Sequence, residues 1–169
     1  MTAPKARPRR SKGTAASRVW PASTLGDYNG PLLLDTHVWI WYLEGDTDAL
    51  SPACRALLER CGSFGELVVC DISYWEVAVK VAKGRLSLSV DAAVWLQRAE
   101  LAPDVRLRPL TRPVLLESTR LGGAVHGDPA DRMLIAFARL EGIPLVTADR
   151  AIIDYAIADR ATPVIDARH

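Results

Sequence analysis

The feature that most constrains the fold of this chain is its alternation of short apolar runs with longer amphipathic segments. The apolar runs have the length of buried strands and occupy residues 32–34, 67–70, 105–107, 145–147 and 164–165. Helical spacing of apolar residues predicts helices at 36–44, 52–62, 74–83, 91–101, 113–121, 129–141 and 150–158. Strands that alternate with helices of this length form parallel sheets with both faces covered. We therefore predict an α/β protein with three layers, in which a central, mostly parallel sheet is flanked by helices.

Several predicted helices carry the residues that commonly begin or end a helix. Ser51–Pro52 and Asp128–Pro129 each pair a capping side chain with a proline suited to the first helical position. Ser73 and Glu76 have the spacing of a capping box, which would put the acid in the first turn. Gly142 stands directly after one predicted helix, where a glycine is expected to end it.

The N-terminal segment differs in composition from the rest of the chain. Residues 1–29 are rich in Pro, Ser, Thr, Ala and Arg and show neither strand nor helix periodicity. We predict that they form a disordered basic extension and that residues 30–169 form one folded domain. The extension is either a nucleic-acid-binding arm or the product of a start codon placed too far upstream, and the sequence leaves both readings open.

Charge is distributed unevenly between the extension and the predicted domain. The chain has 21 basic and 20 acidic residues, and six of the basic ones but no acid lie in residues 1–26. Residues 27–169 therefore hold 15 basic and 20 acidic residues, a net charge of about −5. Such a body cannot bind nucleic acid through a broad positive face. A bound cation or a local group of basic side chains would have to offset the phosphate charge.

Cysteine usage and hydropathy indicate the compartment. Cys54, Cys61 and Cys70 include no C-x-x-C pair, and their odd number argues against a disulfide framework. Buried free thiols in a reducing compartment are the simpler interpretation. No apolar run approaches the roughly 18–20 residues that a membrane span requires. We therefore predict a cytoplasmic protein that has no membrane partner.

Four acidic residues lie where the predicted strands end or where a helix begins. Asp35 ends the first apolar run, Asp149 follows the run at 145–147, and Glu76 and Asp131 lie near helix starts. Each acid alone could simply cap a helix or favour its dipole. Together at one rim of a sheet they would repel one another, and a hard divalent cation would remove that penalty. We predict a site for Mg²⁺, with Mn²⁺ as a substitute, because both ions prefer oxygen ligands.

Three segments also resemble a known family. "LLLDTHVWIWYLEGD", "ISYWEVAVKVAKGRL" and "HGDPADRMLIAFARLEGIPLVTADRAI" resemble the successive signature segments of PIN-domain ribonucleases, in particular the VapC-type toxins of bacterial toxin–antitoxin pairs. The resemblance runs from about residue 31 to 168. It implies a PIN-like fold in which Asp35, Glu76, Asp131 and Asp149 are catalytic and bind the metal ion.

The same resemblance suggests roles for residues beside the four acids. Thr147 matches a frequent hydroxyl position and is expected to orient a carboxylate. Arg132 is a candidate for contacting phosphate or fixing a carboxylate, and His126 for contacting the RNA backbone. Lys80 belongs to a basic group that forms either an RNA-contacting edge or simply a solvated helix face. His37 is expected to pack or to form hydrogen bonds, not to act as the catalytic base.

The resemblance implies a Mg²⁺-dependent endoribonuclease that acts as the toxin of a toxin–antitoxin pair. Its expected partners are an RNA substrate, a cognate antitoxin that blocks the site, and a second copy of the chain in a homodimer. Two alternatives stay open at this point. One is a housekeeping PIN nuclease in RNA processing, and the other is a PIN module that binds RNA or protein without cleaving.

Overall fold

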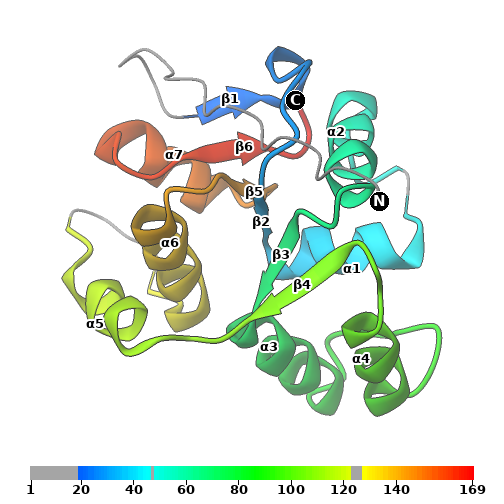
Figure 1. The fold of residues 1–169 in the computed structure, drawn as a ribbon. Coiled ribbons are helices and arrows are strands. Elements are labelled where there is room, and N and C mark those ends of the chain that lie inside the picture. Colours follow the sequence, from blue (N-terminus) through cyan, green and yellow to red (C-terminus); the bar gives the residue numbers. More distant parts are fainter. Residues whose placement is uncertain (1–18, 47, 123–126) are drawn as a thin grey trace, which may run out of the picture.

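The fold is built on one sheet of parallel strands, shown in Figure 1. The computed structural model describes residues 19–46, 48–122 and 127–169. Within these ranges the sheet has six strands in the spatial order β1-β6-β5-β2-β3-β4, and every neighbouring pair is parallel. The strands are β1 (Val19–Pro21), β2 (Leu32–Leu34), β3 (Leu67–Cys70), β4 (Val105–Arg108), β5 (Leu145–Thr147) and β6 (Val164–Asp166).

Helices cover both faces of the sheet, as the sequence predicted. They are η1 (Ala22–Thr24, a single 3₁₀ turn), α1 (Thr36–Glu44), α2 (Pro52–Gly62), α3 (Asp71–Ala82), α4 (Ala92–Glu100), α5 (Arg112–Arg120), α6 (Pro129–Glu141) and α7 (Arg150–Asp159). Alternate residues of β2 point to opposite faces. Leu32 and Leu34 pack with α1, α2 and α4, whereas Leu33 packs with α5, α6 and α7. The predicted three-layer α/β class is therefore confirmed.

Helix α3 crosses the carboxyl end of the sheet and contributes to both cores. Its Ile72 packs with the core that contains α6, and its Val77 packs with the core that contains α1. The predicted capping box is wrong. Strand β3 passes into α3 without a loop and Cys70 occupies the N-cap position, so Ser73 is already inside the helix and is buried. Glu76 consequently lies in the second turn, not in the first.

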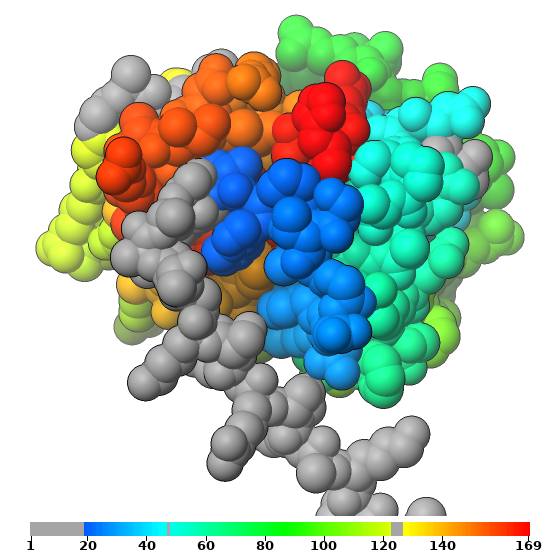
Figure 2. All heavy atoms as spheres, turned by 90° about the horizontal axis from the view of Figure 1, so that it is seen from above, coloured from blue at the N-terminus to red at the C-terminus, as the bar shows by residue number. Residues whose placement is uncertain are grey.

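The predicted domain boundary is also wrong for residues 19–29. Strand β1 pairs in parallel with β6 at the edge of the sheet, and the N–H of Ala22 donates to the carbonyl of His169 at 2.9 Å. In Figure 2 the blue segment after residue 18 lies between the orange α7 and the teal α2, beside the red C-terminal residues. Three strand residues are too few to give a sequence pattern, and pairing with β6 supplies the missing stabilisation. Residues 1–18 lie outside the described residues.

An ionic network of half-buried side chains joins three helices on one face. The guanidinium of Arg139 on α6 donates to Asp159 at 2.7 Å, to the Tyr155 hydroxyl at 2.8 Å and to Glu117 of α5 at 3.3 Å. Arg139 and its two carboxylate partners are each between 20% and 24% exposed. The network therefore ties α5 and α7 to the helix that carries Asp131.

The connections of the sheet diverge at the carboxyl ends of β2 and β5. After β2 the chain continues to β3 on one side, and after β5 it continues to β6 on the other. Ligands of parallel α/β sheets bind where the connections diverge in this way. Within the described residues, no helix combines the length and the apolar character needed to cross a membrane.

Candidate active site

Asp35 lies at this point of divergence, directly after β2. It is 4% exposed, and its side chain does not cap α1 although it occupies the N-cap position. Its Oδ2 accepts a hydrogen bond from the Thr147 hydroxyl at 2.6 Å, and its Oδ1 lies 3.2 Å from His37 Nδ1. Burial raises the pKa of Asp35, but the hydrogen bonds from His37, from Thr147 and from the backbone of Thr36 outweigh burial and hold the pKa below its ordinary value of 3.8.

Thr147 links Asp35 to the loop that carries Asp149. The Thr147 hydroxyl is fully buried; it donates to Asp35 and accepts from the backbone N–H of Asp149 at 2.9 Å. Asp149 in turn caps α7, since its Oδ1 accepts from the N–H groups of Ala151 and Ile152 at 2.7 and 3.3 Å. The hydrogen bond expected from Thr147 to a carboxylate is therefore present.

Glu76 approaches the residues that follow β2 from the second turn of α3. One of its oxygens accepts a hydrogen bond from the Thr36 hydroxyl at 2.6 Å, and the other lies 2.5 Å from Lys80 Nζ. The Glu76 side chain is 16% exposed. The ammonium group of Lys80, which the sequence suggested for RNA contact, is thus directed at one of the site acids.

Asp131 lies in the first turn of α6, after the N-cap Asp128, which accepts a backbone N–H at 2.8 Å as predicted. Burial, together with the negative charges of Asp35, Asp128, Asp149 and Glu76 in that order, raises the pKa of Asp131 to about 7. The fold therefore brings the other three predicted acids within electrostatic reach of Asp131.

His37 and Thr36 contribute to this arrangement in ways that the sequence did not specify. The Nε2 of His37 accepts from the backbone N–H of Ala148 at 2.9 Å, which leaves Nδ1 to carry the proton that faces Asp35. The ring also packs against Trp41, with the centroids 4.7 Å apart. His37 forms hydrogen bonds, as expected. Its bridge from Asp35 to Ala148, which follows β5, depends on tertiary structure. The sequence signal for these two roles was that Thr36 and His37 directly follow Asp35.

The structure places Arg132 against the end of α5. The Arg132 guanidinium donates to the carbonyls of Ser118 and Leu121, at 2.9 and 3.5 Å, and so holds the end of α5. These bonds account for Arg132 as a structural residue. His126 lies outside the described residues.

The donor set fits a hard divalent cation. Four carboxylates supply only oxygen ligands, which Mg²⁺ and Mn²⁺ prefer, and the raised pKa of Asp131 reflects negative charge that a cation would offset. In the described ranges, however, no three Asp, Glu, His or Cys side chains converge closely enough to enclose an ion as they stand. Lys80 occupies one oxygen of Glu76, and His37 occupies one oxygen of Asp35. These contacts agree with the separation of the carboxylates from one another.

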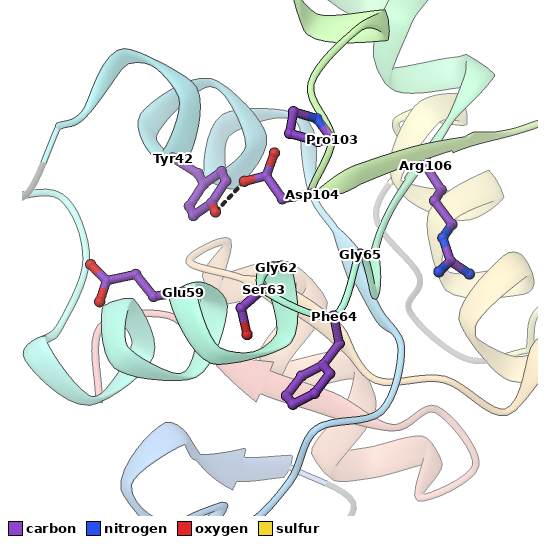
Figure 3. Close-up of a pocket in the computed structure, with 9 residues that line it drawn as sticks. All are labelled: Tyr42, Glu59, Gly62, Ser63, Phe64, Gly65, Pro103, Asp104 and Arg106. Atoms are coloured by element: carbon purple, nitrogen blue, oxygen red, sulfur yellow. Dashed lines mark hydrogen bonds between the residues drawn. The ribbon is translucent and has the colours of Figure 1, made fainter. Parts of the chain in front are cut away.

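A separate hollow of about 660 Å³ lies at the opposite end of the sheet, before β3 and β4 (Figure 3). Tyr42 donates its hydroxyl to Asp104 across this hollow, and Phe64 and Arg106 form part of its lining. None of the predicted site residues lines this hollow, so the hollow is separate from the site formed by the acids.

Comparison with known proteins identifies the family. The model of the PIN domain matches residues 32–158, which include all four acids. The chain is a PIN-domain protein. This PIN-domain protein is 36% identical over 121 residues to Ribonuclease VapC22 of Mycobacterium tuberculosis, a match that covers 72% of this chain and 88% of that one. The predicted VapC-type resemblance is therefore confirmed, and ribonucleases of this family typically use a divalent metal ion.

The fold also resembles that of a solved structure at lower sequence identity. The structure of FitAB bound to an IR36 DNA fragment has a TM-score of 0.51 and 19% identity, covering 82% of this chain and 96% of that one. FitAcB from Neisseria gonorrhoeae has a TM-score of 0.49 and 19% identity, covering 80% of this chain and 97% of that one.

Proposed function

We propose that this PIN-domain protein is the toxin of a toxin–antitoxin pair, a Mg²⁺-dependent endoribonuclease that hydrolyses RNA phosphodiester bonds. The observation that carries the proposal is the gathering of acids from four separate segments around Asp131. The similarity to a ribonuclease over most of the chain supports the same reaction. If each acid served only to cap a helix or to favour its dipole, the four segments would not need to meet.

The four acids have the proposed role of holding the metal ion. Asp35, Glu76, Asp131 and Asp149 would supply carboxylate oxygens to Mg²⁺, and Mn²⁺ would substitute because it has the same ligand preference. When bound, such an ion activates a water molecule and offsets the charge that develops on the phosphate. These four residues are therefore the proposed catalytic set.

The neighbouring side chains have the proposed role of holding the acids in place. Thr147 at the end of β5 and His37 in the first turn of α1 contact the two oxygens of Asp35, and Thr36 holds one oxygen of Glu76. Carboxylates whose orientation is set by such bonds lose less freedom when they bind an ion. The chain thereby reduces the cost of assembling the site.

The proposed partners follow from the VapC-type relationship. We propose that a cognate antitoxin blocks the acid site, that the protein forms a homodimer, and that it acts on RNA in the cytoplasm. The toxin role makes a cellular prediction. Induced expression should stop growth, and co-expression of the small protein encoded by the neighbouring gene should restore it.

An RNA cleavage assay tests the enzymatic proposal. The full chain should cleave total bacterial RNA with Mg²⁺ or Mn²⁺ and lose this activity in EDTA. Asp35→Asn should reduce cleavage by at least about a hundredfold, because it removes a buried charged ligand and keeps the side-chain shape. The control Asp154→Asn alters an acid that is 60% exposed and pairs with Arg150, and should retain full activity. Activity that persists in EDTA or in Asp35→Asn would refute the proposal.

A further inference from the structure

Lys80 and Glu76 form a close ion pair inside the acid site. They lie one helical turn apart on α3, with Lys80 Nζ 2.5 Å from Glu76 Oε1. Since Thr36 donates to Oε2 at 2.6 Å, both oxygens of Glu76 are engaged. A cation could coordinate Glu76 through Oε1 only after the ammonium group had moved.

The surroundings of Lys80 allow that movement. The Lys80 side chain is 40% exposed, whereas that of Glu76 is 16% exposed, so the lysine can turn into solvent while the acid stays in place. The following basic residues of the segment, Lys83 and Arg85, are exposed. An ammonium released from Glu76 would therefore join a basic edge beside the site.

Charge also favours the pairing of Lys80 with the acids when no metal ion is bound. Negative charges of Asp35, Asp149 and Glu76 all act on Asp131, so a nearby ammonium group lowers the repulsion within the site. A divalent cation among the same acids would provide more positive charge and would repel the ammonium group. The two cations therefore compete for one carboxylate.

We propose that Lys80 is an internal counter-ion, which a divalent cation displaces from Glu76 and which then contacts a phosphate of the RNA. This inference rests on the proposed function, because it assigns Glu76 to the metal ion. It makes Lys80 a positioning residue in the metal-free protein and a substrate contact in the loaded one. Metal binding and RNA binding are thereby coupled through one side chain.

The inference is tested first by measuring metal affinity without RNA. Mn²⁺ and Mg²⁺ are titrated into the full chain by calorimetry, with Lys80→Gln, Lys80→Arg and Lys83→Gln as variants. Lys80→Gln should bind the ions about three- to tenfold more tightly, because it removes a competing positive charge. Lys80→Arg keeps the charge and should bind as the wild type does. Lys83→Gln removes an exposed charge from the C-cap of the same helix and should change the affinity less than about twofold.

The second measurement is the KM for RNA at saturating Mg²⁺. Lys80→Gln should raise KM, and its dependence on salt should weaken by the equivalent of about one phosphate contact. The opposite changes in metal and RNA affinity distinguish the proposed exchange from a general structural defect, which would weaken both.

The outcomes separate this inference from the proposed function. If the wild type binds the ions but Lys80→Gln binds them no more tightly, the counter-ion role is refuted and the nuclease proposal stands. If Lys80→Gln binds them more tightly but KM for RNA is unchanged, the phosphate contact is refuted. If the wild type binds neither ion at millimolar concentration, both proposals fail.

Discussion

Asp131→Asn should stabilise the metal-free protein at neutral pH. In the folded chain the pKa of Asp131 is raised from 3.8 to about 7 by burial and by four neighbouring carboxylates. A folded pKa above the unfolded one means that the folded state holds this proton more tightly. The free energy of unfolding therefore falls as pH rises from about 4 to about 7, and the full penalty applies above pH 7. Asparagine has nearly the same shape and no charge, so it removes that penalty.

The magnitude follows from the same pKa values. Raising the pKa of Asp131 from 3.8 to about 7 corresponds to an unfavourable free energy of roughly 4 kcal/mol for the ionised folded state, at about 1.36 kcal/mol per tenfold change in proton affinity. Asp131 is only partly buried, and solvent screening reduces this to about 2 kcal/mol. For a chain of 169 residues this predicts a rise in Tm of about 4–8 °C.

The assay is thermal unfolding followed by circular dichroism, in EDTA, between pH 4 and pH 8. The difference between Asp131→Asn and the wild type should be largest at pH 8 and should vanish near pH 4. Asp154→Asn, which changes an exposed acid on α7, is the matched control and should alter Tm little at any pH. Added Mg²⁺ should raise the Tm of the wild type more than that of Asp131→Asn, because the wild type has the additional ligand. An Asp131→Asn variant that is less stable than the wild type at pH 8 in EDTA would refute the reasoning.

Three further predictions concern the supports of the site. Thr147→Val should lower the free energy of unfolding by about 1–3 kcal/mol in urea titrations, because the buried carboxylate of Asp35 and the backbone N–H of Asp149 lose a partner. Thr147→Ser keeps the hydroxyl and should retain most of the wild-type stability. Arg139→Leu should cost about 2–4 kcal/mol in the same titration, since two half-buried carboxylates lose their shared cation. A loss below about 0.5 kcal/mol in either case would contradict the assigned contacts. Asp35 has a folded pKa below 3.8, so its contribution is present above about pH 4 and is lost as pH falls further; acid titration of Asp35→Asn should show a weaker pH dependence there than the wild type.

The sequence by itself determined the elements whose signals are local. Each predicted strand is present, because a short apolar run bounded by polar residues has few alternatives in a parallel sheet. The caps at Ser51 and Asp128 and the helix end at Gly142 were also predicted correctly, since each depends on contacts within a few residues. The position of Asp35 directly after a buried strand belongs to the same class of signal.

Only the tertiary structure decided the contacts between distant segments. The edge strand β1 depends on its pairing with β6, and its three residues carry no pattern of their own. The helical spacing of Glu76 and Lys80 permits an ion pair, but their place among the acids depends on how α3 packs across the sheet. The bridge from Asp35 through His37 to Ala148 spans more than 100 residues of sequence. Local propensities extend over a few residues, whereas the strength and the partners of a charge depend on every group that the fold brings near it.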